Sequence, residues 1–384
     1  MSAGAAATEV DSLLTEARKA LAPDRRTAVF DVRGELQGTD LLLRGEIQNG
    51  ELKGKLLRYL KKNGSFSIVD SLVVLPHPSL GSATMGVVSV SVANIRTKPG
   101  HGSEMGTQAL LGTTVQFLKV EHGDWYLVQT PDDYLGWSDD HIVRMTPEEY
   151  RAWAEKPKVI VTAEIAFVRT GLDSSSDPVS DVVLGGLLGL IRDVGSAFEV
   201  VFPDGRTGFL DKSAAEPFGP WLAGARETPE RIVATAKRFF GVPYLWGGTS
   251  AKGLDCSGFT KTVYYMNGVV LPRDASQQAD VGKRVEVGED FSGVRPGDLL
   301  FFGGKATEQR PARVTHVAIS LGGRRFIHAS TYVRVNSLDP ADPDYSEGRA
   351  RSFLGVRRII GEDERSGVRR LSQLQSYRPL TGRE

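Results

Sequence analysis

A single cysteine is the most reactive side chain that this sequence offers. Cys256 is the only cysteine in 384 residues and directly follows Asp255. It cannot form a disulfide within the chain, so it is either a small buried apolar side chain or a nucleophile. Apolar residues follow at steps of four and three, at Phe259, Val263 and Met266, which predicts a helix that begins at the cysteine.

The start of a helix favours an anionic cysteine. Asp255 would cap this helix by accepting a hydrogen bond from a backbone N–H, and Cys256 would lie in its first turn. An ordinary thiol is only about 3% ionised at pH 7, and a helix N-terminus contributing roughly 1–2 kcal/mol lowers its pKa by about one unit. A thiolate would therefore be stabilised there, but efficient ionisation also needs a basic partner.

Two of the six histidines follow the cysteine in a pattern typical of a β-hairpin. His316 and His328 lie on either side of the turn-forming pair Gly322-Gly323. A two-residue turn would place the histidines on opposite faces, whereas a three-residue loop with a bulge glycine pairs Leu321 with Arg325 and brings them to one face. The other face then carries only apolar residues, namely Val317, Ile319, Leu321, Ile327 and Ala329. We therefore expect a Cys–His–His site with His316 as the base and His328 as its orienting group.

These residues belong to motifs that resemble a known family. The segment from about Thr228 to Ile360 is similar to the NlpC/P60 cell-wall peptidases, which are papain-like cysteine peptidases. The motifs, in the family's order, are Tyr244-Leu245-Trp246-Gly247-Gly248, Leu254-Asp255-Cys256-Ser257-Gly258, Leu271-Pro272-Arg273, Arg295-Pro296-Gly297-Asp298-Leu299, Thr315-His316-Val317-Ala318-Ile319 and Phe326-Ile327-His328-Ala329. The resemblance implies Cys256 as nucleophile, His316 as base, His328 as third member and Tyr244 beside the nucleophile. It implies no cofactor.

Composition argues against several other classes of protein. Lys+Arg and Asp+Glu both number 47, and this balance argues against a general nucleic-acid or anionic-membrane binder. The sequence contains no run of about 18 apolar residues, so no transmembrane helix is predicted. The remaining histidines lack Cys/His ligand spacing, so no metal site is expected. Residues 1–7 form neither a basic leader nor an apolar core; we expect the cell envelope or periplasm if a leader has been removed, and otherwise the cytoplasm.

The region before the peptidase segment contains an internal repeat. Arg96 and Arg169 are 73 residues apart, and so are Gly112 and Gly185. Short β-rich segments broken by Gly, Asp and Pro turns predict two small barrels. The first, residues 85–147, resembles a bacterial SH3 (SH3b) domain in its Arg-Thr-Lys-Pro and Tyr-Leu-Gly-Trp phrases, and the second, 157–217, lacks the tryptophan.

The elements before residue 80 alternate as helix, strand, strand, helix and strand. They are predicted at 10–22, 27–36, 40–48, 52–62 and 68–75. This order predicts a small α+β module over residues 1–80 that resembles BON-like domains. The expected fold is thus α+β: a papain-like NlpC/P60 catalytic domain over 226–384, preceded by two SH3-like barrels and this module.

An SH3b pair ahead of an NlpC/P60 domain resembles one branch of the family, the γ-D-glutamyl-L-diamino-acid endopeptidases. This likeness implies a murein peptide substrate, L-Ala-γ-D-Glu-diamino acid, and a first SH3b domain that closes one end of the site. An acidic residue there would bind the alanine ammonium, since a buried ammonium needs a carboxylate partner. By this likeness Glu104 is that residue, Tyr134 faces the site, and Tyr244, Asp255 and Ser257 surround the alanine.

Several alternatives remain open from the sequence. The protein could be an endopeptidase on polymeric peptidoglycan with SH3b wall anchors, or an amidase or acyltransferase on the same fold. A non-catalytic wall-binding protein is a further reading, against which the intact Cys–His–His set argues. Glu104 could be only a solvated side chain and Asp255 only a helix cap. The sequence leaves open the preferred diamino acid and the oligomeric state.

Overall fold

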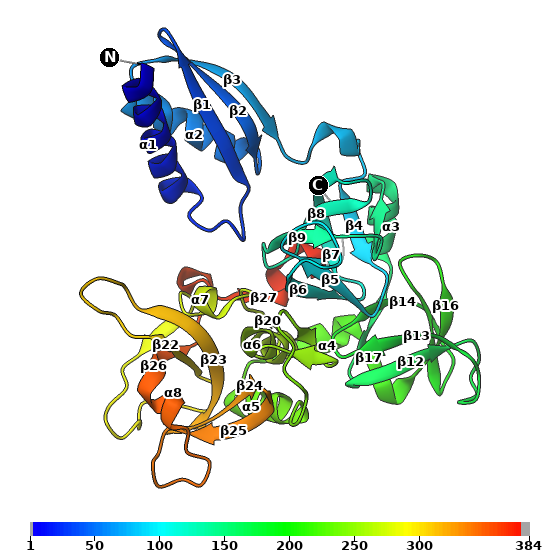
Figure 1. The fold of residues 1–384 in the computed structure, drawn as a ribbon. Coiled ribbons are helices and arrows are strands. Elements are labelled where there is room, and N and C mark those ends of the chain that lie inside the picture. The colour runs from blue at the N-terminus through cyan, green and yellow to red at the C-terminus, as the bar shows by residue number, and fades with distance from the viewer. Residues whose placement is uncertain (1–2, 378–384) are drawn as a thin grey trace.

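The computed structural model describes residues 3–377, whose elements form an N-terminal α+β module, two small barrels and a C-terminal unit (Figure 1). The expected α+β fold class, with two SH3-like barrels ahead of a C-terminal α+β domain, is confirmed. Met1, Ser2 and the last seven residues of the predicted peptidase domain, 378–384, lie outside the described residues. Among the described helices, none is long and apolar enough to cross a bilayer.

The N-terminal module has the predicted order of elements. It comprises α1 (Ala3–Leu21), β1 (Phe30–Gln37), β2 (Asp40–Ile47), α2 (Gly50–Asn63) and β3 (Ser67–Val74). β2 pairs antiparallel with β1 and parallel with β3, because α2 provides the crossover that a parallel pair requires. Leu52, Leu56 and Leu60 recur every four residues and face the buried side chains of β2. The likeness to BON-like domains stays a prediction.

The two barrels have the same strand connectivity. The first contains β4 (Met85–Val88), β5 (Val92–Arg96), β6 (Met105–Leu110), β7 (Thr114–Glu121), β8 (Trp125–Gln129), β9 (Leu135–Ser138) and β10 (Ile142–Met145). After α3 (Pro147–Glu155), the second contains β11 (Lys158–Val161), β12 (Ile165–Arg169), β13 (Pro178–Val183), β14 (Leu187–Asp193), β15 (Ala197–Val201), β16 (Thr207–Asp211) and β17 (Ala215–Pro217). The sheet orders, β10-β4-β7-β8-β9-β5-β6 and β17-β11-β14-β15-β16-β12-β13, correspond strand for strand.

The repeat extends to individual hydrogen bonds. Arg96 Nη1 donates to the carbonyl of Ser103, and Arg169 Nη1 donates to the carbonyl of Ser176, both at 2.7 Å. Because each arginine closes the loop between the second and third strands of its barrel, the 73-residue spacing seen in the sequence has a structural origin.

The C-terminal unit is a six-stranded antiparallel sheet with helices packed on it, in the order β21-β26-β22-β23-β24-β25. Its helices are α4 (Phe218–Gly224), α5 (Pro229–Arg238), α6 (Cys256–Tyr265), α7 (Ala275–Gln278) and α8 (Glu347–Ser352). The sheet strands are β21 (Lys283–Val285), β22 (Leu299–Gly304), β23 (Arg313–Gly322), β24 (Arg325–Ser330), β25 (Tyr332–Ser337) and β26 (Phe353–Arg358). Short strands β18 (Thr249–Ser250), β19 (Gly253–Leu254), β20 (Val269–Val270) and β27 (Arg369–Arg370), and 3-10 turns at 78–80, 212–214, 364–366, 371–373 and 375–377, complete the chain.

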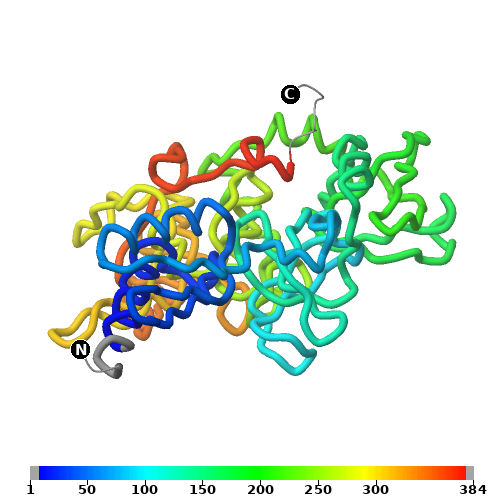
Figure 2. Tube along the Cα trace, turned by 90° about the horizontal axis from the view of Figure 1, so that it is seen from above, coloured from blue at the N-terminus to red at the C-terminus, as the bar shows by residue number. Residues whose placement is uncertain are grey.

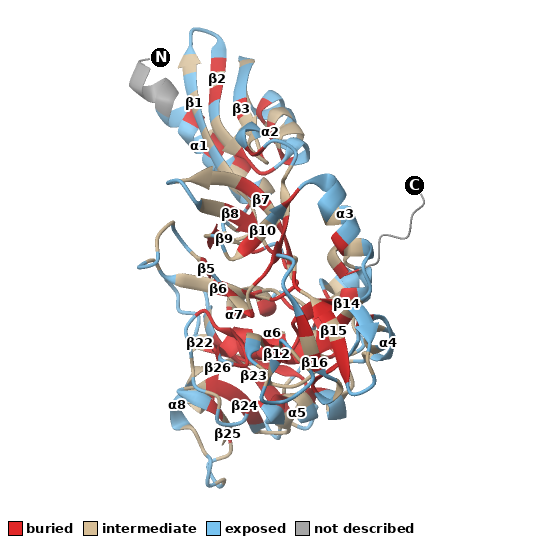
Figure 3. Cartoon of the chain, turned by 90° about the vertical axis from the view of Figure 1, so that its right-hand side faces the viewer, coloured by how far each residue is buried: buried red, intermediate tan, exposed pale blue. Residues whose placement is uncertain are grey.

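Both faces of this sheet are buried, and α6 covers one of them. Phe259 and Val263 of α6 share a fully buried core with Val317, Ile319 and Ile327 of the sheet. The opposite face forms a smaller core. Figure 3 shows these strands mostly in red, the colour of buried residues. The predicted helix is therefore held by the predicted hairpin.

The units are joined by the C-terminal segment. β27 pairs with β20 beside α6, and the chain then runs toward the barrels (red in Figure 2). Tyr377 packs against Tyr265 of α6 and Phe218 of α4, in a cluster with Leu187 of the second barrel. Figure 1 shows the first barrel lying between the N-terminal module and the C-terminal domain. The first barrel is therefore placed to contribute to the site.

Candidate active site

Cys256 is the first residue of α6, as the sequence predicts. Asp255 caps the helix, since its Oδ1 accepts a 2.7 Å hydrogen bond from the backbone N–H of Gly258. The start of the helix lies so close to the preceding loop that a Cβ on Gly258 would fall 1.9 Å from the carbonyl oxygen of Gly248. The position of Cys256 is thus fixed by the Asp255 cap and by the close packing at Gly258. Only 7% of the cysteine surface is exposed.

Asp255 has a second role that the cap alone does not reveal. Its two oxygens also accept hydrogen bonds from Arg273 Nη1 and Nη2, at 3.1 and 2.6 Å, and from the N–H of Gly247 at 2.9 Å. Ser257 Oγ joins the network, lying 3.3 Å from Asp255 and 3.0 Å from Arg273. All three side chains are buried. Asp255 and Ser257 therefore flank the nucleophile in sequence, with their polar atoms already hydrogen-bonded.

The hairpin has the predicted register along its ladder. Ile319 pairs with Ile327 and Ser320 with Phe326, which is the alignment that brings His316 and His328 to one face. The closing turn differs from the prediction, because Gly322 pairs with Arg325 and the extra residue is taken up as a bulge at Leu321. The one extra, unpaired residue that the prediction required is present, but it is Leu321, directly before the two glycines.

The two histidines are in direct contact. His316 Nε2 lies 2.7 Å from His328 Nδ1, and His328 Nε2 lies 3.0 Å from Asn336 Oδ1. Asn336 donates through Nδ2 to the carbonyl of Asp344, so its Oδ1 must act as an acceptor. His328 then carries its proton on Nε2, and its Nδ1 accepts the Nε2 proton of His316. This chain leaves Nδ1 of His316 as the unprotonated nitrogen.

Asn336 is a site residue that the sequence analysis missed. It lies on β25, where His328 pairs with Arg334 across the ladder. Every second residue of a strand shares a face, so Tyr332, Arg334 and Asn336 lie on the face that carries His328. The sequence 332–337 alternates in the way that a strand requires. Extending the predicted sheet by one strand would have placed Asn336 beside the histidines.

Burial disfavours the charged forms of the Cys256 thiol and of both imidazoles. Burial raises the pKa of the Cys256 thiol to about 11, and the neighbouring Asp255 adds to this, while the backbone N–H groups of Val317 and Ser257 oppose it. Burial lowers the pKa of His316 well below its usual range and that of His328 to about 3. The helix N-terminus therefore does not make the thiolate the resting state, because desolvation exceeds its effect, in line with the expectation that the helix alone is not enough.

The first barrel forms one wall of the site. Met105 of β6 lies against the loop before Cys256, where a Cβ on Gly247 would be 2.4 Å from the Met105 carbonyl oxygen. At the same place the Nε1 of the exposed Trp246 donates to Glu104 Oε1 at 2.8 Å. Among residues 3–377, Trp246 is the one side chain hydrogen-bonded to the Glu104 carboxylate. The predicted Glu104 is thus next to the cysteine loop and accessible.

The two predicted tyrosines differ in what they contact. Tyr244 is half-buried, and burial together with the nearby Cys256 and Asp255 raises its pKa. Tyr134, from the first barrel, donates through its hydroxyl to Asp274 Oδ2 at 3.3 Å, and burial raises its pKa as well. Both residues therefore border the site, although Tyr134 contacts it through Asp274.

One group of side chains in the part of the chain that the structure describes could hold a metal ion. It is Asp139, Asp140 and His141 of the first barrel, whose ligand atoms lie within 4.8 Å of one another. His316 and His328 bond to each other and to Asn336 instead. The chemistry at Cys256 is therefore that of a thiol and an imidazole.

Comparisons with known proteins identify the family of the C-terminal unit and of the first barrel. A model of the NlpC/P60 family matches residues 241–357, and one of the bacterial SH3 domain matches 91–142. Gamma-D-glutamyl-L-lysine dipeptidyl-peptidases of Bacillus cereus and Bacillus subtilis are 30% and 31% identical over 68% and 69% of this chain, covering 77% and 80% of their own lengths. A crystal structure of an NlpC/P60 family protein from Bacillus cereus superposes with a TM-score of 0.60 at 24% identity, covering 72% of this chain and all of that one.

Proposed function

Because the chain belongs to the NlpC/P60 family of peptidases, we propose that it hydrolyses the γ-D-glutamyl–L-diamino-acid bond of murein peptides whose N-terminal L-alanine is free. The names of the two Bacillus relatives support a γ-D-glutamyl substrate. One observation carries the proposal: the acidic Glu104 of the first barrel meets the loop before Cys256 at Trp246. This contact supports a role for an accessible carboxylate beside the loop that leads to the nucleophile.

The reaction begins with a proton transfer between two neutral groups. Nδ1 of His316 takes the proton of the Cys256 thiol as the sulfur attacks the γ-carbonyl carbon of D-glutamate. The carbonyl oxygen becomes an oxyanion, and backbone N–H groups in the first turn of α6, which have no intrahelical partners, stabilise it. His328 and Asn336 keep His316 in the tautomer that accepts this proton.

The second half of the reaction releases both products. When the tetrahedral intermediate collapses, the C–N bond breaks and His316 gives its proton to the amine of the diamino acid. The acyl group remains on sulfur as a thioester. A water molecule, deprotonated by His316, then attacks that thioester, and L-Ala-D-Glu leaves with a new carboxylate while the thiol is regenerated. The thiol supplies the proton that leaves with the amine, and water supplies the proton that restores the thiol, each carried by His316.

The alanine end of the substrate requires a negative charge, and the exposed Glu104 beside the loop before Cys256 can give it. Asp255 is also near, but its oxygens are occupied by Arg273, Gly247 and Gly258. An ammonium ion that leaves water loses several kcal/mol unless a carboxylate compensates it. Glu104 therefore distinguishes a peptide with a free amine from one whose alanine is joined to a sugar by an amide.

The proposal is tested with two substrates and one control. The protein is incubated with L-Ala-γ-D-Glu-diamino-acid tripeptide or with intact sacculi, and the products are identified by mass. We expect L-Ala-D-Glu and the free diamino acid from the tripeptide, little release from sacculi, and no product with Cys256→Ala. Efficient release from sacculi would support an endopeptidase on polymeric peptidoglycan instead, and product from Cys256→Ala would exclude the cysteine as nucleophile.

A further inference from the structure

The face of the sheet that carries the two histidines also carries an arginine. His328 on β24 pairs directly with Arg334 on β25, and Ser330 pairs with Tyr332, so these side chains lie on one face. The guanidinium carbon of Arg334 lies 5.5 Å from the centre of the exposed Tyr332 ring. A cation therefore lies beside His328, on the side away from β22 and β26.

A second arginine reaches the same face from helix α8. The guanidinium carbon of Arg349 lies 5.7 Å from the centre of the Phe302 ring, which packs against His316, and its Nη2 lies 3.4 Å from Ser330 Oγ. Burial lowers the pKa of Arg349, the nearby Cys256 and Tyr244 raise it, and Arg334 lowers it. Arg349 is thus close enough to both the nucleophile and Arg334 to interact with their charges.

Neither arginine is compensated by a carboxylate. Within residues 3–377, no carboxylate oxygen lies within 4 Å of either guanidinium group, and the buried Nε of Arg334 has no hydrogen-bond partner. Their neighbours differ: Arg351 on α8 pairs with Glu347, and Arg325 on β24 pairs with Asp344. Two half-buried cations that repel each other and lack a carboxylate partner are costly for the folded protein unless an anion binds.

The direction of the substrate decides which anion this is. In the proposed function the alanine end is held at Glu104, on the first-barrel side of Cys256, so the leaving diamino acid extends toward β24, β25 and α8. Its α-carboxylate is two bonds from the scissile nitrogen. Diaminopimelate carries a second carboxylate at the far end of its side chain, whereas L-lysine carries only an ammonium there.

We propose, on the basis of this function, that Arg349 binds the α-carboxylate of the leaving diamino acid and Arg334 binds its distal carboxylate, so that the protein selects diaminopimelate over L-lysine. Arg349 contacts Phe302, which packs against the catalytic base His316, whereas Arg334 lies beside His328, and this order matches the position of the α-carboxylate. Arg334 lies one step further along the same face, and its charge repels the ammonium of a lysine side chain. A guanidinium group binds a carboxylate through two parallel hydrogen bonds, which gives this pairing its directionality.

The first test compares substrates on the unaltered protein. Three tripeptides are compared: L-Ala-γ-D-Glu-meso-diaminopimelate, its distal carboxamide and L-Ala-γ-D-Glu-L-Lys. Only the first of them carries a distal carboxylate. We expect kcat/KM to be about 10- to 100-fold higher for the first peptide than for the other two. Equal values for all three would overturn the inference and leave the proposed function intact, whereas no cleavage of any of them would overturn the proposed function itself.

The second test uses variants with a matched control on the same helix. Arg334→Gln should lower kcat/KM for the diaminopimelate peptide by a similar factor and leave the distal carboxamide within about threefold, because the two changes remove the same contact. Arg349→Gln should lower all three, since the α-carboxylate is common to them, and Arg351→Gln should change none. Equal losses on all three peptides in Arg334→Gln would mean a structural role and overturn the assignment. If that variant does not fold, the carboxamide comparison on the unaltered protein still decides.

Discussion

Cys256 and His316 are neutral before substrate binds, because each is buried too deeply for its charged form to be well solvated. The pair therefore differs from a preformed thiolate–imidazolium pair. The proton must cross from sulfur to nitrogen during the attack, and the tautomer of His316 decides whether it can. Asn336 controls that tautomer through two successive hydrogen bonds, the first to His328 and the second from His328 to His316.

We predict that Asn336→Ala lowers kcat on the tripeptide by about 100-fold. Without the acceptor at Oδ1, the Nε2 proton of His328 is no longer fixed, and His328 can donate to His316 instead of accepting from it. KM and the thermal unfolding midpoint should change little, because Asn336 does not contact the proposed substrate path. An unchanged kcat would show that the asparagine does not set the tautomer.

The pH dependence of alkylation tests the neutral thiol. Since burial raises the pKa of Cys256 to about 11, the thiolate fraction should rise with pH throughout the range from 6 to 10. The rate of iodoacetamide alkylation, followed by mass as a single adduct, should therefore rise steadily without a plateau near neutrality. A rate that is constant between pH 6 and 8 would instead indicate a preformed ion pair.

The acid side of the activity profile follows from His316. Its pKa lies well below 6.5, so the imidazole stays unprotonated as the pH falls through 6.5, and the loss of kcat/KM should begin only at more acidic pH. Measuring kcat/KM on the tripeptide between pH 4 and 7 checks this direction of the His316 pKa shift. A loss centred near 6.5 would mean that His316 is solvated in the working enzyme.

At the scale of single elements, the helix and the hairpin could be predicted because their signals are local. The Asp255 cap, the apolar spacing of α6 and the segregation of apolar residues on β23 and β24 were all readable from the sequence. The bulge at Leu321 was not, because the same register can be reached with the extra residue at more than one position. Arg349 could not be placed either, since nothing in the short helix α8 indicates which strands it covers.

The start of α6 depends on a glycine. In Gly258→Ala, the new Cβ would lie 1.9 Å from the Gly248 carbonyl oxygen, so helix and loop must separate. We predict a loss of about 1–3 kcal/mol in the free energy of unfolding, together with lower activity, measured by chemical denaturation. Gly219→Ala in helix α4 is the matched control, because a Cβ there meets nothing within 4 Å and should be neutral or slightly stabilising. Equal effects of both changes would contradict this account of the contact.

At the scale of the whole molecule, the N-terminal module contacts the wall of the site. Arg26 Nη1 lies 2.8 Å from Asp274 Oδ2 and 2.9 Å from Ser276 Oγ, and Asp24 accepts a 2.8 Å hydrogen bond from Gln277. Asp274 is also the partner of Tyr134. These contacts join residues about 250 positions apart in sequence, and no local pattern could have predicted them.

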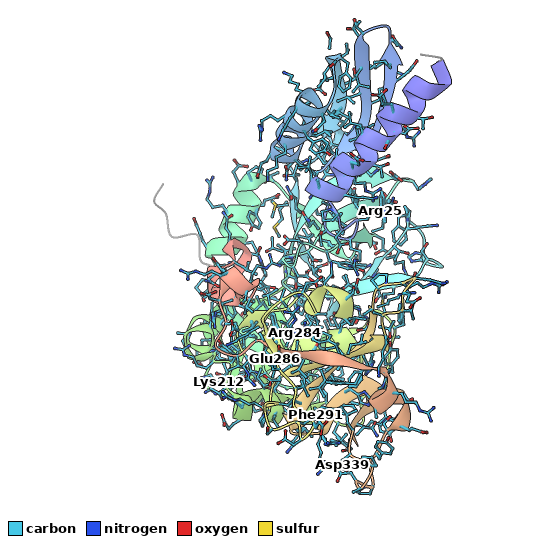
Figure 4. The ribbon with its side chains drawn as sticks, turned by 90° about the vertical axis from the view of Figure 1, so that its left-hand side faces the viewer. Arg25, Lys212, Arg284, Glu286, Phe291 and Asp339 are labelled. Atoms are coloured by element: carbon cyan, nitrogen blue, oxygen red, sulfur yellow. The ribbon has the colours of Figure 1, made fainter. Side chains whose placement is uncertain are left out.

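Arg26 therefore positions Asp274 and, through it, Tyr134. We predict that Arg26→Ala raises KM for the tripeptide about two- to fivefold with little change in kcat, because a partly exposed ion pair is worth no more than about 1 kcal/mol. Arg25→Ala is the control: Figure 4 shows Arg25 where the N-terminal module meets the rest of the molecule, and this side chain is exposed. Identical kinetics for both variants would mean that the module does not act on the site.

The central claim, that this peptidase recognises a free alanine amine through Glu104, is tested most directly by acetylating that amine. We predict that kcat/KM falls about 30-fold to several-thousand-fold for the acetylated tripeptide, and that Glu104→Gln causes a similar loss on the free peptide but little on the acetylated one. Asp177→Asn is the control, because Asp177 takes the corresponding position in the second barrel. Equal cleavage of free and acetylated peptides by the unaltered protein would contradict the claim.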